Sequence, residues 1–244
     1  MEIADPHSEE SEHAMAFDVA TALAAMARDG YAVLPQVVSA ATVDALVEFV
    51  EAAVVSAGGE YVHFKDSDAF GEVLARAWPE ESQVDRVIRG VFAAGVGRPA
   101  PAGRPFRVLR CISGLSGANR SLNFHFDSYA LTAVVPVMIP SDSPGDLLLM
   151  PNARPLRRWY VANLLDQILV SNRIAQSYFR RKWRSRPEEF VHLRPVPGNV
   201  YLFWGYRALH ANEPCHPSRT RATVLLHYGN VHEHSAIARV VRSR

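Results

Sequence analysis

Cysteine is scarce in this chain, and its scarcity excludes a scaffold held together by disulfides. Only Cys111 and Cys215 occur among the 244 residues, and they form no C-x-x-C pair. Small secreted domains that depend on disulfides carry many more cysteines at close spacing. The sequence therefore predicts free thiols in a reduced, cytoplasmic setting.

A large net charge and long apolar runs are also absent. Lys and Arg total 26 against 25 Asp and Glu, which gives a net charge of +1. This balance gives no global case for a nucleic-acid partner. No apolar stretch reaches the ~18 residues of a membrane span. The acidic segment 1–13 lacks the basic start and apolar run of a signal peptide, so we expect a soluble protein without a transmembrane segment.

The length and the patterning favour one domain, residues 1–244, with a core built mainly of strands. Residues 1–15 are polar without periodicity, which predicts disorder. Helical spacing of apolar residues occurs at 17–26, after Ser39, and near 69–77 and 83–94. Extended apolar segments bounded by turn residues predict strands at 31–34, 106–112, 130–140, 145–151, 200–204 and 221–228.

A basic helical segment, residues 154–189, interrupts the strands. Its apolar residues recur at helical intervals among several arginines. One interpretation is a helical pair that covers a sheet or forms the interface of a homodimer. The other is a lid that attracts an anionic substrate or rests on an anionic membrane surface.

The residues with the most specific chemistry are His125 and Asp127. In an extended segment they point to the same side and offer an imidazole nitrogen and a carboxylate oxygen to one ion. His210 follows the strand 200–204 and supplies a third candidate ligand. Two histidines and one carboxylate can occupy one face of the coordination octahedron of non-haem Fe(II), which leaves the opposite positions open for a substrate and O₂.

A candidate anion-binding residue follows on the next strand. Arg221 lies eleven positions after His210, and Thr223 shares its face of the strand. A guanidinium at this place can bind a carboxylate through two parallel hydrogen bonds. His227 lies on the same face, where we expect a neutral ring that donates to a backbone carbonyl.

His125, Asp127, His210 and Arg221, in this order, resemble the pattern of the Fe(II)/2-oxoglutarate-dependent dioxygenases of the phytanoyl-CoA hydroxylase-like family. The segment 29–35 is similar to the opening strand of that family. The resemblance implies a mainly β fold (α+β), a double-stranded β-helix or jelly roll, with flanking N-terminal helices and a helical insertion.

The resemblance also implies a reaction. His125, Asp127 and His210 would bind Fe(II), and 2-oxoglutarate would pair with Arg221 and Thr223. Further candidates for holding the cosubstrate or the substrate are Asn123 and Arg110. The family uses O₂ to hydroxylate a C–H bond of a small molecule, with release of succinate and CO₂. Halogenating members lack the acid, so Asp127 favours hydroxylation, or a related desaturation or ring closure.

Two other interpretations stay open at this point. A cupin-like jelly-roll metalloprotein would use the same three ligands for Zn²⁺, Ni²⁺ or Mn²⁺ without 2-oxoglutarate, but it has no need of Arg221. A binding module without catalysis is disfavoured by the complete ligand set. A second group, His232, Glu233 and His234, has no third ligand with comparable strand context, and we expect it to be solvated.

Overall fold

The computed structural model describes residues 18–66, 68–77, 82–155 and 160–230. The expected disorder of residues 1–15 and the group around His232 lie outside the described residues. Among the described residues, no helix combines the length and the apolar character needed to cross a bilayer. The cytoplasmic setting stays a prediction.

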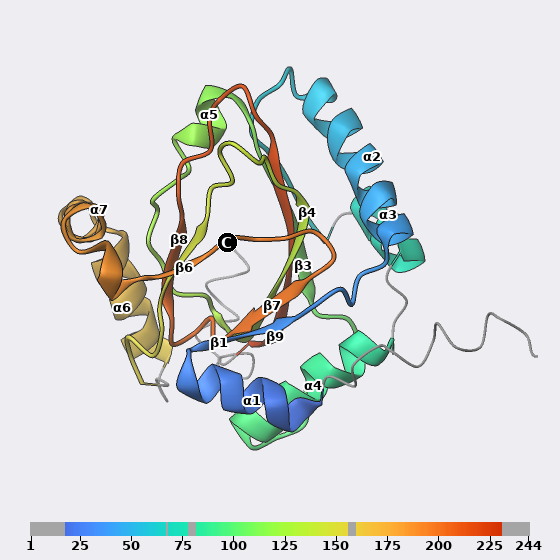
Figure 1. Cartoon of the computed structure of the whole chain (residues 1–244). Coiled ribbons are helices and arrows are strands. Elements are labelled where there is room, and N and C mark those ends of the chain that lie inside the picture. The colour runs from blue at the N-terminus through green and yellow to red at the C-terminus, as the bar shows by residue number, and fades with distance from the viewer. Residues whose placement is uncertain (1–17, 67, 78–81, 156–159, 231–244) are drawn as a thin grey trace, which may run out of the picture.

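Two antiparallel sheets face each other and form the core of the molecule (Figure 1). The larger sheet has the order β1-β7-β4-β9-β3-β2, and the smaller has the order β6-β5-β8. The strands of the larger sheet are β1 (Tyr31–Leu34), β7 (Val200–Phe203), β4 (Tyr129–Met138), β9 (Arg221–Asn230), β3 (Phe106–Ile112) and β2 (Val62–Lys65). Those of the smaller are β6 (Val191–Leu193), β5 (Leu147–Met150) and β8 (Leu209–Asn212). The predicted jelly roll is confirmed.

The chain alternates between the two sheets near its end, and this alternation positions the site. β7 lies in the larger sheet, β8 in the smaller, and β9 again in the larger. His210 on β8 and Arg221 on β9 therefore approach one interior from opposite sides. Every second residue of β9 points inward, as the sequence predicts for a strand: Arg221, Thr223, Leu225 and His227 line the interior.

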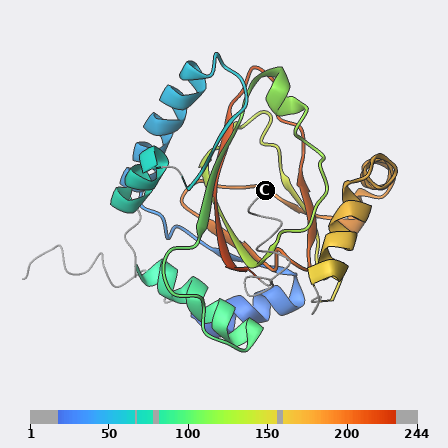
Figure 2. The same ribbon diagram turned by 180° about the vertical axis from the view of Figure 1, so that it is seen from behind.

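Helices cover the outer face of the larger sheet, as Figures 1 and 2 show from opposite sides. They are α1 (Val19–Arg28), α2 (Ala40–Ser56), α3 (Asp68–Ala77) and α4 (Gln83–Val96). α2 begins where the sequence predicts, because the Ser39 side chain accepts a hydrogen bond from the backbone N–H of Thr42. Their apolar faces, with Leu46, Val50 and Phe92, pack on the sheet and form the main core.

The predicted insertion is a helical pair, α6 (Tyr160–Ser171) and α7 (Arg173–Ser185), followed by a short 3₁₀ turn, η1 (Pro187–Glu189). Phe179 and Trp183 of α7 pack on a cluster that contains Phe124 and Leu148. The pair thus covers the smaller sheet, as one of the two interpretations proposed. A short helix, α5 (Gly114–Ala118), follows β3.

Three strands were not predicted. β2 has only four residues at the edge of the larger sheet, and its side chains alternate between half-buried and exposed. β6 has three residues and follows η1, and β8, which carries His210, has four residues. All three are too short to produce a period in sequence, and pairing with neighbouring strands specifies them.

A buried polar group fastens α4 to β9. The Asp85 carboxylate accepts hydrogen bonds from Tyr228 Oη at 2.9 Å and from Arg89 Nε at 2.6 Å. Arg89 also donates to the carbonyls of Pro101 and Gly103, which holds the glycine- and proline-rich connection to β3. Burial of the Tyr228 hydroxyl raises the pKa of the tyrosine well above its usual value, and the neighbouring Asp85 carboxylate raises it further.

Replacing Asp85 by alanine should therefore destabilise the protein. The change removes two hydrogen bonds and leaves the Tyr228 hydroxyl without its acceptor, at a cost of about 2–3 kcal/mol. Urea unfolding followed by circular dichroism measures this free energy. Asp142→Ala is the matched control, because Asp142 pairs with Arg219 at the exposed surface and its loss should matter little. Equal effects of the two substitutions would contradict the structural role of Asp85.

Candidate metal centre

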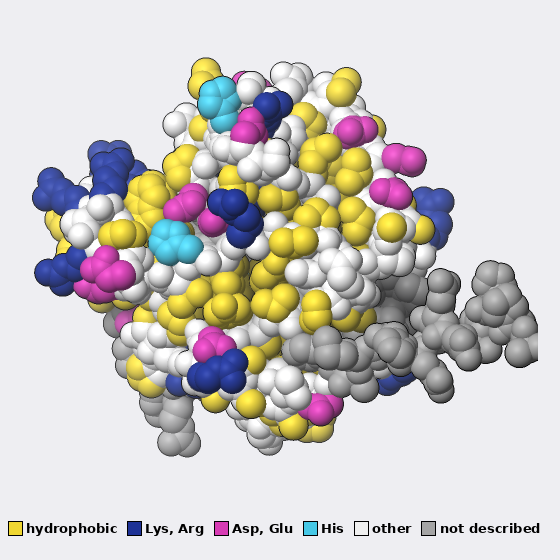
Figure 3. Space-filling view, viewed as in Figure 1, with side chains coloured by type: hydrophobic (Ala, Val, Ile, Leu, Met, Phe, Trp, Pro, Cys, Tyr) yellow, Lys and Arg dark blue, Asp and Glu magenta, His cyan; other side chains and the backbone are white. Residues whose placement is uncertain are grey.

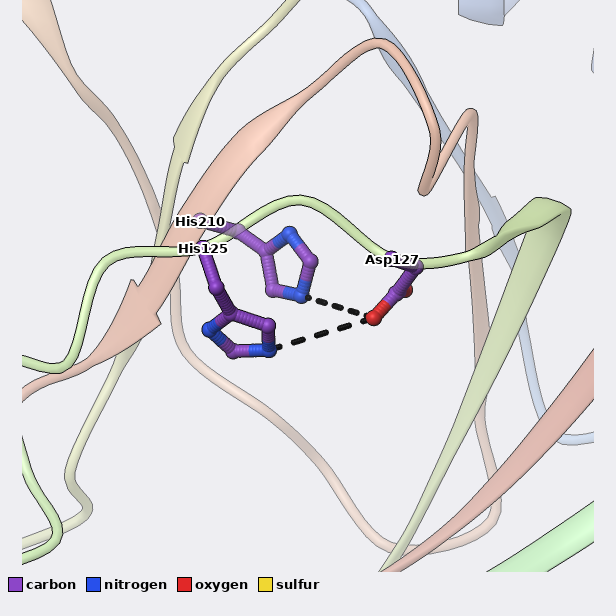
Figure 4. A group of neighbouring side chains, drawn as sticks. All are labelled: His125, Asp127 and His210. Atoms are coloured by element: carbon purple, nitrogen blue, oxygen red, sulfur yellow. Dashed lines mark ion pairs between the residues drawn. The ribbon is translucent and has the colours of Figure 1, made fainter. Parts of the chain in front are cut away.

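Backbone pairing places the two histidines side by side. His125 lies in an extended segment before β4 and forms an isolated bridge with His210 of β8. Each backbone N–H donates to the carbonyl of the other residue at 3.0 Å. The two imidazole rings consequently lie with their centroids 4.3 Å apart, on the interior side of the bridge (Figure 4).

Both imidazoles are oriented by hydrogen bonds to the backbone. Nδ1 of His125 lies 2.9 Å from the carbonyl oxygen of Asn123, and Nδ1 of His210 lies 3.1 Å from that of Ala208. A carbonyl only accepts, so each Nδ1 carries the proton. Each Nε2 then has its lone pair free for a metal ion, an arrangement typical of metal-binding histidines.

Asp127 completes the group. Its Oδ1 lies 3.8 Å from Nε2 of His125 and 3.6 Å from Nε2 of His210 (Figure 4). The three ligand atoms all lie within 4.8 Å of one another. Ligands on one octahedral face at ~2.1 Å from the ion lie about 3 Å apart, so a small contraction suffices. These three residues can hold a divalent ion.

The second carboxylate oxygen of Asp127 is held away from that position. Thr132 Oγ1 of β4 donates to Oδ2 at 2.5 Å and lies 3.2 Å from Nδ1 of His227. Because the hydroxyl proton goes to the carboxylate, the Thr132 oxygen accepts from the imidazole N–H. His227 thus bonds to a side chain, and the predicted bond to a backbone carbonyl is wrong. The network leaves Oδ1 for the metal.

The charges of the three residues also suit a metal. Desolvation and the neighbouring His210 ring lower the pKa of His125 to about 4, so the ring is neutral at pH 7. Burial alone would raise the pKa of Asp127, but the surrounding imidazoles and the Thr132 hydroxyl bring it below its usual value. Neutral imidazole and ionised carboxylate are the forms that bind metals.

Gly205 leaves the space that the carboxylate occupies. Its backbone carbonyl accepts from the N–H of Asp127 at 3.0 Å. A Cβ at this position would lie 2.5 Å from Oδ2 of Asp127 and would also collide with Oγ1 of Thr132. The sequence alone singles out neither Gly205 nor Thr132. The only local signal was a glycine directly after the strand 200–204.

Gly205→Ala should therefore weaken metal binding. The methyl group displaces Asp127 and breaks its bond to Thr132, and we expect Fe(II) affinity to fall about 10–100-fold, as for other residues that orient metal ligands. Anaerobic Fe(II) titration measures the change. Gly71→Ala is the matched control, because that Cβ meets only the flexible end of Arg107. Unchanged affinity in Gly205→Ala would refute the proposed fit.

A second charged group shares the pocket. Arg221 begins β9, has 1% of its surface exposed, and its Nε has no hydrogen-bond partner among the described residues. Desolvation, followed by the charge of Arg110, lowers its pKa to about 10, so it is protonated at pH 7. Such a buried cation is costly unless an anion joins it. An anion bound beside Arg221 would offset this cost.

The structure brings together most of the predicted site residues. The pocket is lined by Arg110, His125, Asp127, His210, Arg221 and Thr223. Arg110 on β3 lies opposite Thr223 on β9 in the sheet register. The Asn123 side chain is exposed and does not line this pocket, although its carbonyl orients His125. Its role toward a cosubstrate stays a prediction.

Comparison with solved structures shows which proteins share this fold. A prolyl hydroxylase from Trichoplax adhaerens, in complex with a peptide of hypoxia inducible factor, has a TM-score of 0.59 at 12% identity and covers 96% of this chain and 98% of its own. An oxidoreductase of the 2OG-Fe(II) oxygenase family from Burkholderia pseudomallei has a TM-score of 0.55 at 13% identity and covers 88% and 91%. The chain has the fold of the 2OG-Fe(II) oxygenases.

The 2OG-Fe(II) oxygenase fold also occurs in the epimerase SnoN from nogalamycin biosynthesis. This non-haem α-ketoglutarate-dependent enzyme has a TM-score of 0.54 at 16% identity and covers 87% of this chain and 82% of its own. No family model matches the sequence, and a search of curated proteins gives no match either. The likeness to the phytanoyl-CoA hydroxylase-like family therefore stays a prediction. At such identities the fold is shared, and function has to be argued from the site.

Proposed function

We propose that this protein is an Fe(II)- and 2-oxoglutarate-dependent oxygenase. The observation that carries the proposal is the buried Arg221, whose Nε has no hydrogen-bond partner among the described residues, in the same pocket as the convergent group of His125, Asp127 and His210. A metal site alone fits many proteins. A metal site with a desolvated guanidinium beside it fits a cosubstrate that binds the metal at one end and carries a carboxylate at the other.

Each residue then has a defined role. His125 Nε2, His210 Nε2 and Asp127 Oδ1 would hold Fe(II), and Thr132 keeps the other Asp127 oxygen away from it. Arg221, with the Thr223 hydroxyl on the same face of β9, would bind the distal carboxylate of 2-oxoglutarate. When bound, iron and 2-oxoglutarate would supply the oxidising chemistry, in which the substrate, 2-oxoglutarate and O₂ yield the hydroxylated substrate, succinate and CO₂.

The walls of the pocket exclude water from this chemistry. Val134, Leu147, Phe203 and Leu225 line it together with the polar residues. An apolar lining strengthens the attraction between Arg221 and a carboxylate, because few water molecules screen it. It also protects a reactive centre from side reactions.

The charges in the pocket favour a small substrate that carries an anionic group. Arg110 and Arg221 contribute two positive charges and Asp127 one negative charge. A divalent ion and the dianion of 2-oxoglutarate cancel each other, which leaves one positive charge. Arg110 has no ion pair among the described residues, and an acidic natural product, amino acid or acyl compound would balance it.

The cupin-like alternative explains less of the site. Another divalent metal can occupy the same three ligands, and this alternative accounts for His125, Asp127 and His210. It gives no function to Arg221. The burial of this charge, with no hydrogen-bond partner for Nε among the described residues, would then lower stability without serving to bind a ligand. No observation favours this alternative specifically.

An anaerobic titration tests the proposal. Metal-free protein receives one equivalent of Fe(II) and then increasing 2-oxoglutarate, and we expect a weak visible charge-transfer band that saturates at one equivalent. Glutarate is the matched control, because it has both carboxylates but lacks the 2-oxo group that chelates the metal. Absence of the band, together with tight binding of another divalent metal, would refute the oxygenase and leave the cupin-like alternative.

A further inference from the structure

Exposed apolar side chains gather at one end of the helical pair. Among the described residues, seven large hydrophobic side chains are exposed. Four of them lie in the α6–α7 pair, within a span of eleven residues. These four are Ile168 (57% exposed), Leu169 (61%), Ile174 (84%) and Tyr178 (58%). We call these four residues the hairpin patch. Such clustering on a surface marks an interaction site more often than single exposed residues do.

The spacing along α7 separates this patch from the buried face. Ile174 and Tyr178 are one turn apart and share a face of the helix. Gln176, Phe179 and Trp183 lie on the other side, against the barrel. The rest of the exposed face carries Arg173, Arg181 and Arg184, and α7 contains no acidic residue. The inward face of α7 is therefore apolar, and its outward face combines apolar and basic side chains.

The basic residues of this outward face have no partners within the described chain. Lys182 and Arg186 pair with Glu189, and Arg180 donates to the carbonyl of Leu122. Arg173, Arg181 and Arg184, in contrast, form no ion pair and no side-chain hydrogen bond among the described residues. Figure 3 shows basic side chains gathered over the α7 end of the molecule, with hydrophobic ones beside them. The positive charge of this outward face of α7 therefore favours an anionic partner.

The hairpin patch is also preformed. Gln176 is buried and accepts from the backbone N–H of Phe124 at 3.0 Å, while its Nε2 donates to the carbonyls of Phe124 and Val170. These bonds fasten α7 to α6 and to the segment that leads into His125. A partner can therefore bind without first ordering the two helices, which keeps the entropic cost low.

We propose that the hairpin patch binds the surface of an anionic lipid bilayer. Ile168, Leu169, Ile174 and Tyr178 would enter the boundary between headgroups and acyl chains, and the three arginines would contact lipid phosphates. A second copy of the chain fits less well, because a two-fold contact through this patch would bring the same arginines face to face. This inference does not depend on the proposed reaction.

Flotation of the full-length protein with extruded vesicles tests the inference. We expect binding to vesicles of phosphatidylcholine and phosphatidylglycerol at low salt, and little binding to phosphatidylcholine alone. Ile174→Glu should reduce the partition coefficient about tenfold or more, because it removes an apolar anchor and adds a repelled charge. Val55→Glu is the matched control, since Val55 is 78% exposed on α2, outside the patch. It should bind as the unchanged protein does.

The basic residues are tested by Arg181→Gln with Arg184→Gln. At about fivefold per basic residue, the pair should weaken binding to anionic vesicles about 25-fold. Circular dichroism of each variant establishes that it is folded. Failure of the folded protein to float with anionic vesicles would overturn the inference. So would a dimer in analytical ultracentrifugation that Ile174→Glu dissociates, because the patch would then be a contact between copies.

Discussion

His210→Ala is expected to abolish the binding of Fe(II) at micromolar concentrations. His210 is 7% exposed, its ring is fixed by Ala208, and its Nε2 is one of only three convergent ligand atoms in this group. Removing it leaves two ligands, and His227, another imidazole that lines the pocket, lies beside Oδ2 of Asp127 and Thr132, away from the position of Oδ1. We expect the affinity for Fe(II) to fall at least 100-fold, more than for loss of a residue that only orients a ligand.

Isothermal titration under anaerobic conditions measures this affinity, and the 2-oxoglutarate band should disappear with it. His216→Ala is the matched control, because His216 is exposed on a loop and, among the described residues, its ring forms hydrogen bonds only with Ser218. A His210→Ala protein that is folded and still binds Fe(II) as tightly as the control would show that the metal lies elsewhere.

The grouping of His125, Asp127 and His210 could be predicted because it depends on local geometry. In an extended segment His125 and Asp127 must share a side, and the strand before His210 indicated a second element of the same kind. Arg221, Thr223 and His227 followed from the same period of two on one strand. For these residues the neighbours in sequence determine the direction of the side chain, and the fold only had to bring the segments together.

Asn123 shows where this reasoning fails. It has the same parity as His125 and Asp127, but the chain turns just before it, at Leu122, whose φ is 51°. The backbone N–H of Leu122, in place of that of Asn123, donates to the carbonyl of Asn212 on β8, so the regular pairing at His125 and His210 does not extend back to residue 123. The exposed Asn123 side chain is not among the residues that line the pocket, while its backbone carbonyl does orient His125.

Thr132 and Gly205 could not be predicted, for a different reason. Their importance lies in contacts with Asp127, and these contacts depend on how β4 and the turn after β7 meet in space. A threonine in an apolar strand and a glycine in a turn are common for many other reasons. Only the arrangement of the two sheets distinguishes them.

Arg221→Met should make the metal-free protein more stable while it impairs cosubstrate binding. The guanidinium is buried and its Nε has no hydrogen-bond partner among the described residues, and its pKa of about 10 means that the buried charge destabilises the protein at every pH below about 10. Methionine fills similar space without a charge, so we expect the free energy of unfolding to rise by about 1–2 kcal/mol. The affinity for 2-oxoglutarate should fall about 100-fold or more, because the distal carboxylate loses its buried cation.

Arg107→Met is the matched control with the opposite expected sign. Arg107 lies on β3, is 12% exposed, and pairs with Asp66 at 3.0 Å, so its loss should lower stability and leave 2-oxoglutarate affinity unchanged. Urea unfolding of the metal-free proteins and 2-oxoglutarate titration of the Fe(II)-loaded proteins give the two quantities.

The two measurements together decide the role of Arg221. If Arg221→Met destabilises the protein as Arg107→Met does, Arg221 stabilises the fold and does not serve to bind an anion. If it stabilises the protein but binds 2-oxoglutarate normally, the anion site exists and 2-oxoglutarate is not its ligand. Only a gain in stability together with a loss of affinity supports the assigned role, because only a residue kept for a ligand is costly without it.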